Sequence, residues 1–416
     1  MASEPKVFMD ERRRAASTWA RSTKSTPYQR TGQGAAGVAR LPRWRRSWAS
    51  QLISACTGTA SSGYPEGVLT RNGSSNTRWK GDLGCRLTRR LARRSPEFWL
   101  ATKYGVYVIF LLVVVYFSVV CDNFLSLSNI LNILQQAAPL GIAVLGMVFV
   151  LSTASTDISV GQVMYVTGVI CGLVLEKFRD NGLAGNGWAI LAVWLVGLCI
   201  GAVFGAFNGL LVGKFGIVSF IVTLATMSIA RGLGLIISRS KVYYMSELSP
   251  FSQSVVGPIR FPVVVILQLV MVLIFAFLYR KTPFGRHIDA VGNDEAAAKS
   301  VGINTARVKF LAFLLCGITA SIAALLLAGQ VANVYSSFSY GNEFVVISAA
   351  VLGGTSLFGG KGNIIPGALI GIVLIQTIMN GLTMLNASPY SYTIVKGLII
   401  FVAVLLDSVN YKGELR

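Results

Sequence analysis

Residues 137–175 read AAPLGIAVLGMVFVLSTASTDISVGQVMYVTGVICGLVL, in which a polar segment divides two apolar runs. The runs cover 137–152 and 159–175, and each is shorter than the roughly 20 apolar residues that cross a ~30 Å hydrocarbon core. Short or interrupted spans are typical of helices that line a cavity or a substrate route. The stretch therefore predicts two helices that meet at a polar break within the membrane.

The same pattern continues on both sides of this stretch. Of the 416 residues, 53% are hydrophobic and 13% charged, whereas soluble domains carry about 25% charged residues. Because lipid-exposed backbone must satisfy its own hydrogen bonds, apolar runs at this density indicate helices. We expect an all-α membrane protein with about ten spans, several of them short or broken. The expected spans are 104–120, 137–152, 159–175, 188–212, 216–237, 262–279, 308–329, 344–358, 364–385 and 392–408.

The basic charge gathers before the first span. Residues 1–103 hold 20 of the 37 Lys and Arg residues but only 6 of the 17 acidic ones. Residues 1–95 lack a lasting helical or strand period, which predicts a disordered basic N-terminal extension. A start codon placed upstream of the true one is an alternative origin for it. A tail that binds RNA is a further alternative, but loops beside the spans share the excess, so we expect no nucleic-acid partner.

The positive-inside rule orients the spans. Ten crossings from a cytoplasmic N-terminus place both termini and loop 280–307 in the cytoplasm. That loop carries the largest internal basic cluster, and loop 238–261 fits less well because it is basic and falls outside. The basic residues of the inner loop are Arg280, Lys281, Arg286, Lys299 and Arg307, and those of the outer loop are Arg239, Lys241 and Arg260.

Other kinds of site find little support. The six cysteines are scattered without a CxxC pair, and His287 is the single histidine, so we expect no metal site. The segment 351–362 superficially resembles a phosphate loop, but Thr355 replaces the first glycine and Gly362 follows Lys361. We expect a tight turn between two helices there, and no nucleotide, cofactor or catalytic site.

Polar residues at the breaks are candidates for the translocation path. An ionisable group at membrane depth is costly and usually faces a cavity or a partner, which singles out Asp157. The alternative is structural, with Asp157 or Thr156 as the N-cap of the following helix. Both interpretations stay open. The path candidates are Asp157, Ser159, Thr223, Thr226 and Ser356.

Five glycines recur every four residues in the fourth span, so they lie on nearly one face of a helix. Such a ridge allows close approach of another helix, and helix packing is the favoured interpretation. A glycine-lined pore wall is the alternative. The ridge consists of Gly197, Gly201, Gly205, Gly209 and Gly213.

The inner loop contains a predicted short helix near 293–302. Asn293 or Asp294 can cap it, acidic residues follow in its first turn, and Gly302 can end it. A rigid helix in a long inner loop suits docking on a partner, although a surface helix without a partner would show the same pattern.

Taken together, these segments resemble the sugar-type branch of ABC-transporter permeases, which includes ribose, xylose, galactose and autoinducer-2 importers. The resemblance covers about 120–408. It is carried by Asn129–Asn132 with Ala143–Val150, Thr156–Gly161, Phe220–Ala225 with Arg231-Gly232, Gly292–Gly302, Gly353–Gly360, and Ser388–Tyr390 with Lys396-Gly397. One departure is Ala154-Ser155-Thr156, where the family usually has two glycines and an isoleucine.

The resemblance implies a permease of two inverted five-helix halves in the bacterial cytoplasmic (inner) membrane, paired with a second copy or a paralogue. Cytoplasmic ABC ATPase subunits would supply the energy, and a periplasmic or lipid-anchored binding protein would deliver a simple sugar or similar neutral solute. The predicted short helix would be the coupling element that docks on the ATPase. Its coupling residues would be Asn293, Asp294, Glu295, Ala296, Ala297, Gly302 and Ile303.

Two other functions fit the sequence less well. An ion-coupled secondary transporter or channel usually places ionisable groups within its spans, and here Asp157 and Arg231 are nearly the only ones. A membrane enzyme is disfavoured because the sequence contains no cluster of nucleophile, histidine and carboxylate.

Overall fold

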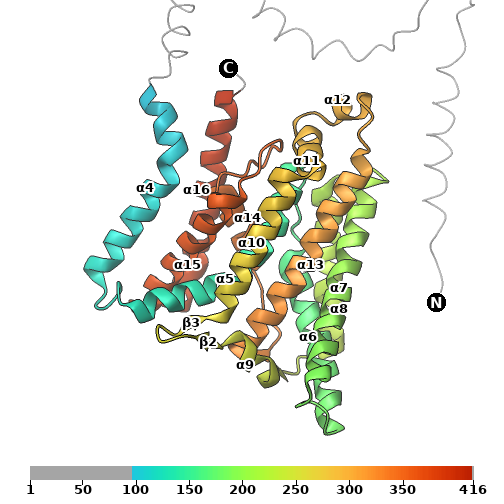
Figure 1. Ribbon diagram of the computed structural model, residues 1–416, viewed down its shortest axis with the longest axis vertical. Coiled ribbons are helices and arrows are strands. Elements are labelled where there is room, and N and C mark those ends of the chain that lie inside the picture. Colours follow the sequence, from blue (N-terminus) through green and yellow to red (C-terminus); the bar gives the residue numbers. More distant parts are fainter. Residues whose placement is uncertain (1–95, 415–416) are drawn as a thin grey trace, which may run out of the picture. The chain divides into compact units, whose positions relative to one another are not determined.

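The computed structural model describes residues 96–414 of the chain, which lie in one compact unit. The predicted basic extension over residues 1–95 falls outside the described residues. The long helices are α4 (Pro96–Val120), α5 (Leu127–Ser152), α6 (Val160–Asp180), α7 (Gly187–Gly213), α8 (Ser219–Ser238), α10 (Val263–Lys281), α13 (Thr305–Val331), α14 (Asn342–Leu352), α15 (Leu369–Met384) and α16 (Pro389–Glu414). The short elements are β1 (Tyr243–Tyr244), η2 (Ser246–Leu248), α9 (Ser249–Ser252), β2 (Val255–Val256), β3 (Phe261–Pro262), α11 (Pro283–Asn293), α12 (Glu295–Ser300), β4 (Asn333–Val334) and η3 (Ile364–Ala368) (Figure 1).

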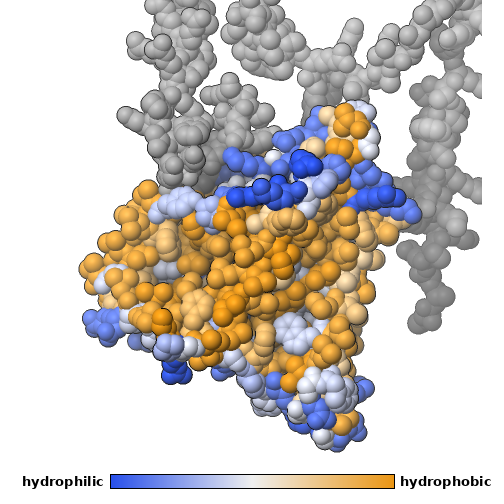
Figure 2. Space-filling view, viewed as in Figure 1, coloured by the Kyte–Doolittle hydropathy of each residue, from blue (hydrophilic) through white to orange (hydrophobic). Residues whose placement is uncertain are grey.

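The described part of the chain contains seven helices long and apolar enough to cross a membrane. Three shorter apolar helices, in α4, α14 and α16, overlap the remaining predicted spans. Large apolar side chains are exposed along α4, α7 and α10, among them Val119, Val203 and Leu273. Figure 2 shows this apolar surface as a broad band with polar residues towards both ends. Such a surface suits lipid, so the chain is a helical multi-pass membrane protein.

The core forms around α5 and α13. Every residue of α5 from Ala137 to Ser152 is buried, and α5 packs against α10, α13, α14 and α15. The predicted glycine ridge lies on α7 and faces α13. A Cβ built on Gly201 would lie 2.2 Å from Gly317 O, and one on Gly205 would lie 2.6 Å from Phe313 O. The two backbones therefore approach too closely for side chains between them. The other ridge positions, Gly197, Gly209 and Gly213, also face α13.

Helix boundaries differ from the predicted spans at several places. Helix α5 begins at Leu127, ten residues before the predicted span, and carries Pro139 in its interior. Proline bends a helix because it removes a hydrogen bond and its ring clashes with the preceding turn. Helix α14 ends at Leu352, six residues early, because Gly353 and the loop after it leave the helical path.

Two loop groups gather at opposite ends of the bundle (Figure 1). At the first, called the β1 end, β1 pairs antiparallel with β4, joining loops 239–262 and 332–341. Ion pairs tie the same region to the end of α6: Lys241 to Glu176, and Arg179 to Glu247 at 2.7 Å. The pair of Lys241 with Glu176 balances one of the positive charges that made loop 238–261 a poor fit to the positive-inside rule. At the second, called the α12 end, lie α11 and α12.

Candidate functional site

The loop between α5 and α6, called the first break (Thr153–Ser159), is held by buried side chains. Asp157 is 2% exposed and accepts hydrogen bonds from the N–H (2.9 Å) and hydroxyl (2.6 Å) of Ser159. Asn208 of α7 donates to the Ser159 hydroxyl at 3.0 Å, and Thr226 of α8 donates to Asn208 Oδ1 at 2.6 Å. The result is a continuous buried chain that joins the first break to α7 and α8, called the Asp157 network.

The structure corrects one detail of the prediction for this break. The N-cap position of α6 is Ser159, whose side chain makes no capping hydrogen bond. Asp157 stands two residues earlier and binds Ser159 instead, so neither Asp157 nor Thr156 is the N-cap. Of the other path candidates, Thr223 donates to Ser219 O at 2.9 Å beside the break, and Thr226 belongs to the network. Ser356 lies in the loop after α14, where its Oγ accepts a hydrogen bond from Phe358 N at 3.1 Å.

Ala154 gives the first break an unusual backbone. Its φ is +55°, in the left-handed region, which costs residues other than glycine about 1–2 kcal/mol. This is the position where chains of the resembled type usually carry glycine. Buried hydrogen bonds on both sides of Ala154 compensate, including that of Thr153 Oγ1 to Val150 O at 2.8 Å.

The loop between α14 and η3, called the second break (Gly353–Asn363), is built mainly from backbone. Gly354, Gly359 and Gly360 have positive φ values of 88°, 88° and 74°, conformations that favour glycine. Asn363 holds the loop closed by donating to Gly353 O at 2.9 Å. The glycines of 353–362 therefore form the tight turn between helices that the sequence predicted.

Both breaks meet the end of α11 at one point, called the glycine junction. Gly360 N donates to Ser152 O at 3.0 Å, and Gly292 packs between the same two groups. A Cβ on Gly292 would lie 1.9 Å from Ser152 O and 2.4 Å from Gly360 N. Any side chain at position 292 would push the two breaks apart.

Side chains reinforce the glycine junction. Tyr279, at the end of α10, donates its hydroxyl proton to the Asp289 carboxylate of α11, and its oxygen lies 3.2 Å from Ser152 Oγ. Phe284 of α11 stacks on Phe149 of α5, with ring centroids 5.8 Å apart. Burial raises the pKa of Asp289, and the hydrogen bond from Tyr279 lowers it in part. Helix α11 is thus fixed to the end of α5.

Helix α12 follows as a short projecting helix. Asp294 is its N-cap and accepts hydrogen bonds from Ala296 N and Ala297 N at 2.8 and 3.0 Å. Gly302, with φ +85°, follows its last turn, as predicted. Burial opposes ionisation of Glu295, but hydrogen bonds from Lys299 and Lys309 outweigh this and lower its pKa to about 2. The sequence did not predict α11, although Pro283 at its first position and the apolar spacing of Phe284, Ile288 and Val291 are helix signals.

A group of polar side chains beside the first break was not predicted from the sequence. Glu343, at the start of α14, is 2% exposed. A Cβ built on Gly161 would lie only 1.9 Å from Glu343 Oε2. Arg231 lies over the ring of Tyr165 at 4.9 Å. Within residues 96–414, Glu343 Oε2, Arg231 Nη1 and both amide atoms of Gln162 have no hydrogen-bond partner. Each such buried group costs about 1–3 kcal/mol.

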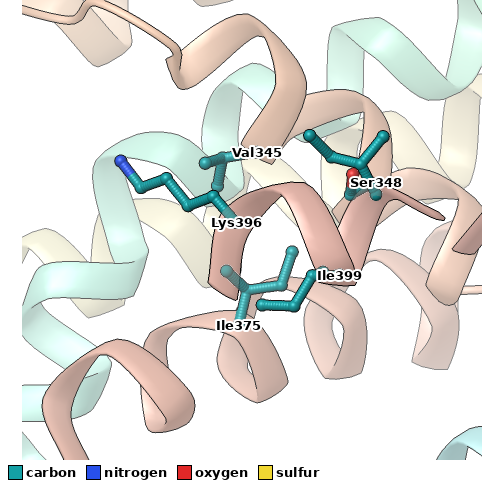
Figure 3. A pocket seen from close by; sticks show the side chains of 6 residues that line it. Val345, Ser348, Ile375, Lys396 and Ile399 are labelled. Atoms are coloured by element: carbon teal, nitrogen blue, oxygen red, sulfur yellow. The ribbon is translucent and has the colours of Figure 1, made fainter. Parts of the chain in front are cut away.

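Lys396 brings a second positive charge to this polar group. The charges of Lys396 and Arg231 both act favourably on the Glu343 carboxylate. Lys396 lines a small cavity of about 10 Å³ with Val345 and Ser348 of α14, roughly enough for one water molecule. In Figure 3 its ammonium group points away from Ser348. A glutamate just before one apolar run and a lysine inside another were the available sequence signals.

Comparison with known proteins shows which family this chain resembles. The family model described as the permease component of branched-chain amino acid transport systems matches residues 129–404. The chain is 32% identical to the ribose import permease protein RbsC of Escherichia coli K12 over 320 residues, which cover 76% of this chain and 96% of that protein. It is 33% identical to the L-arabinose transport system permease protein AraH of E. coli K12, covering 75% and 92%. It is 35% identical to RbsC of Bacillus subtilis, covering 73% and 92%. No solved structure shows significant similarity to the chain.

The matched region contains both breaks, α11 and α12, and nearly all the apolar helices. The chain therefore belongs to the family of permease components of binding-protein-dependent ABC importers, in its sugar-import branch.

Proposed function

We propose that this chain is the membrane-spanning subunit of an ATP-driven importer that carries a simple sugar, or a similar neutral polar solute, across the bacterial inner membrane. The observation that carries the proposal is the glycine junction. It joins α11, and through it α12, to both helix breaks by direct backbone contact. A push on α12 would reach both breaks without passing through a flexible linker.

The proposed coupling segment is the α12 helix with its flanks, residues 293–303. Ala296, Ala297 and Val301 are exposed apolar residues on a helix that projects from the bundle. An exposed apolar helix suits insertion into a groove of a separate protein. The ATPase supplies that groove in this proposal, because the described residues include no nucleotide-binding fold.

The proposed path runs past the Asp157 network and the polar group of Gln162, Arg231 and Glu343. The side chains of Asp157 and Ser159 are closed against each other here, which fits a gate in its shut state. Opening would free hydrogen-bonding groups for a polar solute. The exposed polar groups would then replace solute–water hydrogen bonds in alternating access.

The topology proposed is about ten crossings in two inverted five-helix halves, with both termini and the α12 end in the cytoplasm. The β1 end then faces outward, towards a periplasmic or lipid-anchored binding protein. A second permease copy or a paralogue completes the transmembrane path. The relatives named as ribose and L-arabinose permeases favour pentoses among the sugars.

Reconstitution in proteoliposomes tests this function. The chain together with its ATPase and binding protein should accumulate D-ribose or L-arabinose only when ATP is present. The chain alone should accumulate neither. Accumulation by the chain alone under an ion gradient would overturn the proposal in favour of a secondary transporter, and ATP-driven uptake of L-leucine but no sugar would overturn the substrate class.

A further inference from the structure

A pocket at the β1 end is lined by carboxamide side chains: Asn132, Gln135, Gln136, Gln253 and Gln330. Its volume is about 220 Å³, whereas about 10–15 Å³ suffices for one water molecule. Pockets for drug-sized ligands begin at roughly 300 Å³, so this space suits a smaller solute such as a monosaccharide.

Three parts of the chain build this carboxamide pocket. Asn132, Gln135 and Gln136 lie in the first part of α5, before Pro139. Gln330 lies near the end of α13, and Gln253 directly follows α9. In Figure 1 the α9 region lies at the end of the bundle opposite α12. Helix α5 continues from the pocket to the first break, so one helix connects the two sites.

Hydrogen bonds between these segments hold the pocket walls together. Gln330 Nε2 donates to Gln135 O at 2.7 Å, and Gln253 Nε2 donates to Gln330 O at 3.1 Å. Gln376 of α15 donates to Gln136 Oε1 at 2.6 Å. These bonds orient three of the five carboxamides and connect α5, α13 and the α9 loop.

The remaining amide atoms form a mixed set of donors and acceptors. Within the described part of the chain, no hydrogen bond engages the side-chain amides of Asn132 and Gln135 or the side-chain oxygens of Gln253 and Gln330. Neutral hydroxyl groups both donate and accept, so they match carboxamides well. No charged residue lines the pocket, so it offers no counter-ion to an ionic ligand.

We infer that the carboxamide pocket is a binding site for a neutral polyhydroxylated solute, which it receives at the outer face before the solute reaches the first break. The inference rests on the proposed function for the direction of transport, but the chemistry of recognition rests on the pocket itself. It assigns recognition of sugar hydroxyls to the permease as well as to the delivering protein.

The test compares Asn132→Ala/Gln135→Ala with the control Asn181→Ala in the reconstituted importer, using D-ribose and L-arabinose. Asn181 is an exposed carboxamide that bonds only to Lys177 O of its own turn. Loss of two hydrogen bonds to the solute, worth about 1 kcal/mol each, predicts a roughly thirtyfold fall in uptake for the double variant. Thermal unfolding should stay unchanged, because neither substituted side chain makes a hydrogen bond within the described part of the chain.

The outcomes separate this inference from the proposed function. If the unaltered importer takes up sugar and the double variant matches Asn181→Ala, the pocket inference is wrong. If the unaltered importer takes up no sugar, the proposed function fails and the pocket is tested by itself. In that case the solubilised permease should show a D-ribose- or L-arabinose-dependent rise in unfolding temperature that the double variant lacks. Absence of that rise, or an equal rise with L-leucine, would overturn the inference.

Discussion

The two helix breaks start alike and are completed differently. Each follows the end of a buried helix, and each has a residue at positive φ near its start: Ala154 at 55° and Gly354 at 88°. The N–H of that residue donates to the carbonyl three positions back in both cases. A buried hydroxyl residue comes next, Ser155 in the first break and Thr355 in the second.

Beyond that point the first break relies on side chains and the second on backbone. The Asp157 network fixes the first break to α7 and α8 by buried hydrogen bonds. The second break uses glycines at positive φ and contacts α11 through Gly360. The first should therefore be sensitive to changes of polarity, and the second to any added Cβ. Gly292 contacts both loops, so it should be sensitive to any added side chain.

The largest effect is expected at that shared contact. Gly292→Val would place atoms against backbone of both breaks, and overpacking of this kind should destabilise by about 3 kcal/mol. The control is Gly232→Val, since no atom lies within 4 Å of a Cβ there. Thermal unfolding in detergent measures both. Equal unfolding temperatures for the two variants would show that the glycine junction is not tightly packed.

Replacing a polar residue of the Asp157 network with an apolar one should destabilise the first break selectively. Asn208→Leu removes the partner of Thr226 and of the Ser159 hydroxyl, and should cost about 2 kcal/mol because buried polar groups lose their hydrogen bonds. Asn380→Leu is the matched control, since Asn380 is also buried but its Oδ1 has no partner among the described residues. That change should be neutral or stabilising. An equal loss of stability in the two variants would contradict the role given to the Asp157 network.

Exchanging the residues at positive φ compares the breaks directly. Ala154→Gly should stabilise the chain by about 1 kcal/mol by relieving backbone strain, and Gly354→Ala should destabilise it by about 1–2 kcal/mol. The nearest atom to a Cβ on Gly354 is Asn363 Nδ2 at 3.6 Å, so strain and not crowding decides the result. Unfolding temperatures of the two single variants provide the measurement, and shifts of the same sign would refute the comparison.

The smallest effect concerns the charge on α12. The folded-state pKa of Glu295 is about 2, below its ordinary value of 4.5. Its ionised form therefore stabilises the fold above pH 4.5, and this stabilisation is lost as pH falls towards 2. Because Glu295 is partly exposed, Glu295→Gln should lower stability by less than about 1 kcal/mol at pH 7. The difference in unfolding temperature from the unaltered chain should shrink below pH 4.5, and a difference that grew would contradict the assignment.

The features that could be predicted from the sequence are those that local chemistry determines. Apolar runs predicted the membrane helices, the glycine period predicted a face that the structure packs on α13, and Asp294 and Gly302 bounded a short helix where α12 lies. Each of these signals depends on residues close together in the chain. The alternative in which Asp157 or Thr156 caps α6 is wrong, because Asp157 accepts from the N–H and hydroxyl of Ser159, which itself stands at the N-cap position.

Features that depend on distant contacts were out of reach. In the predicted topology Glu343 lies in the loop just before span 344–358. The fold places it against Gly161, which is far away in the chain. The glycine junction joins positions 152, 292 and 360, and the carboxamide pocket joins α5 with α9 and α13. No spacing along the sequence indicates such meetings, because they depend on how the helices pack.

The most direct test of the account is ATP-driven sugar uptake by Ala297→Arg, measured together with binding of the ATPase. Ala297 is exposed on α12, and its hydrogen bond to Asp294 uses only backbone N–H, so the fold should tolerate the change. The control is Val242→Arg, an exposed apolar residue at the β1 end. We predict that Ala297→Arg loses both ATPase binding and uptake, whereas Val242→Arg keeps ATPase binding. Normal ATPase binding and uptake by Ala297→Arg would contradict the account.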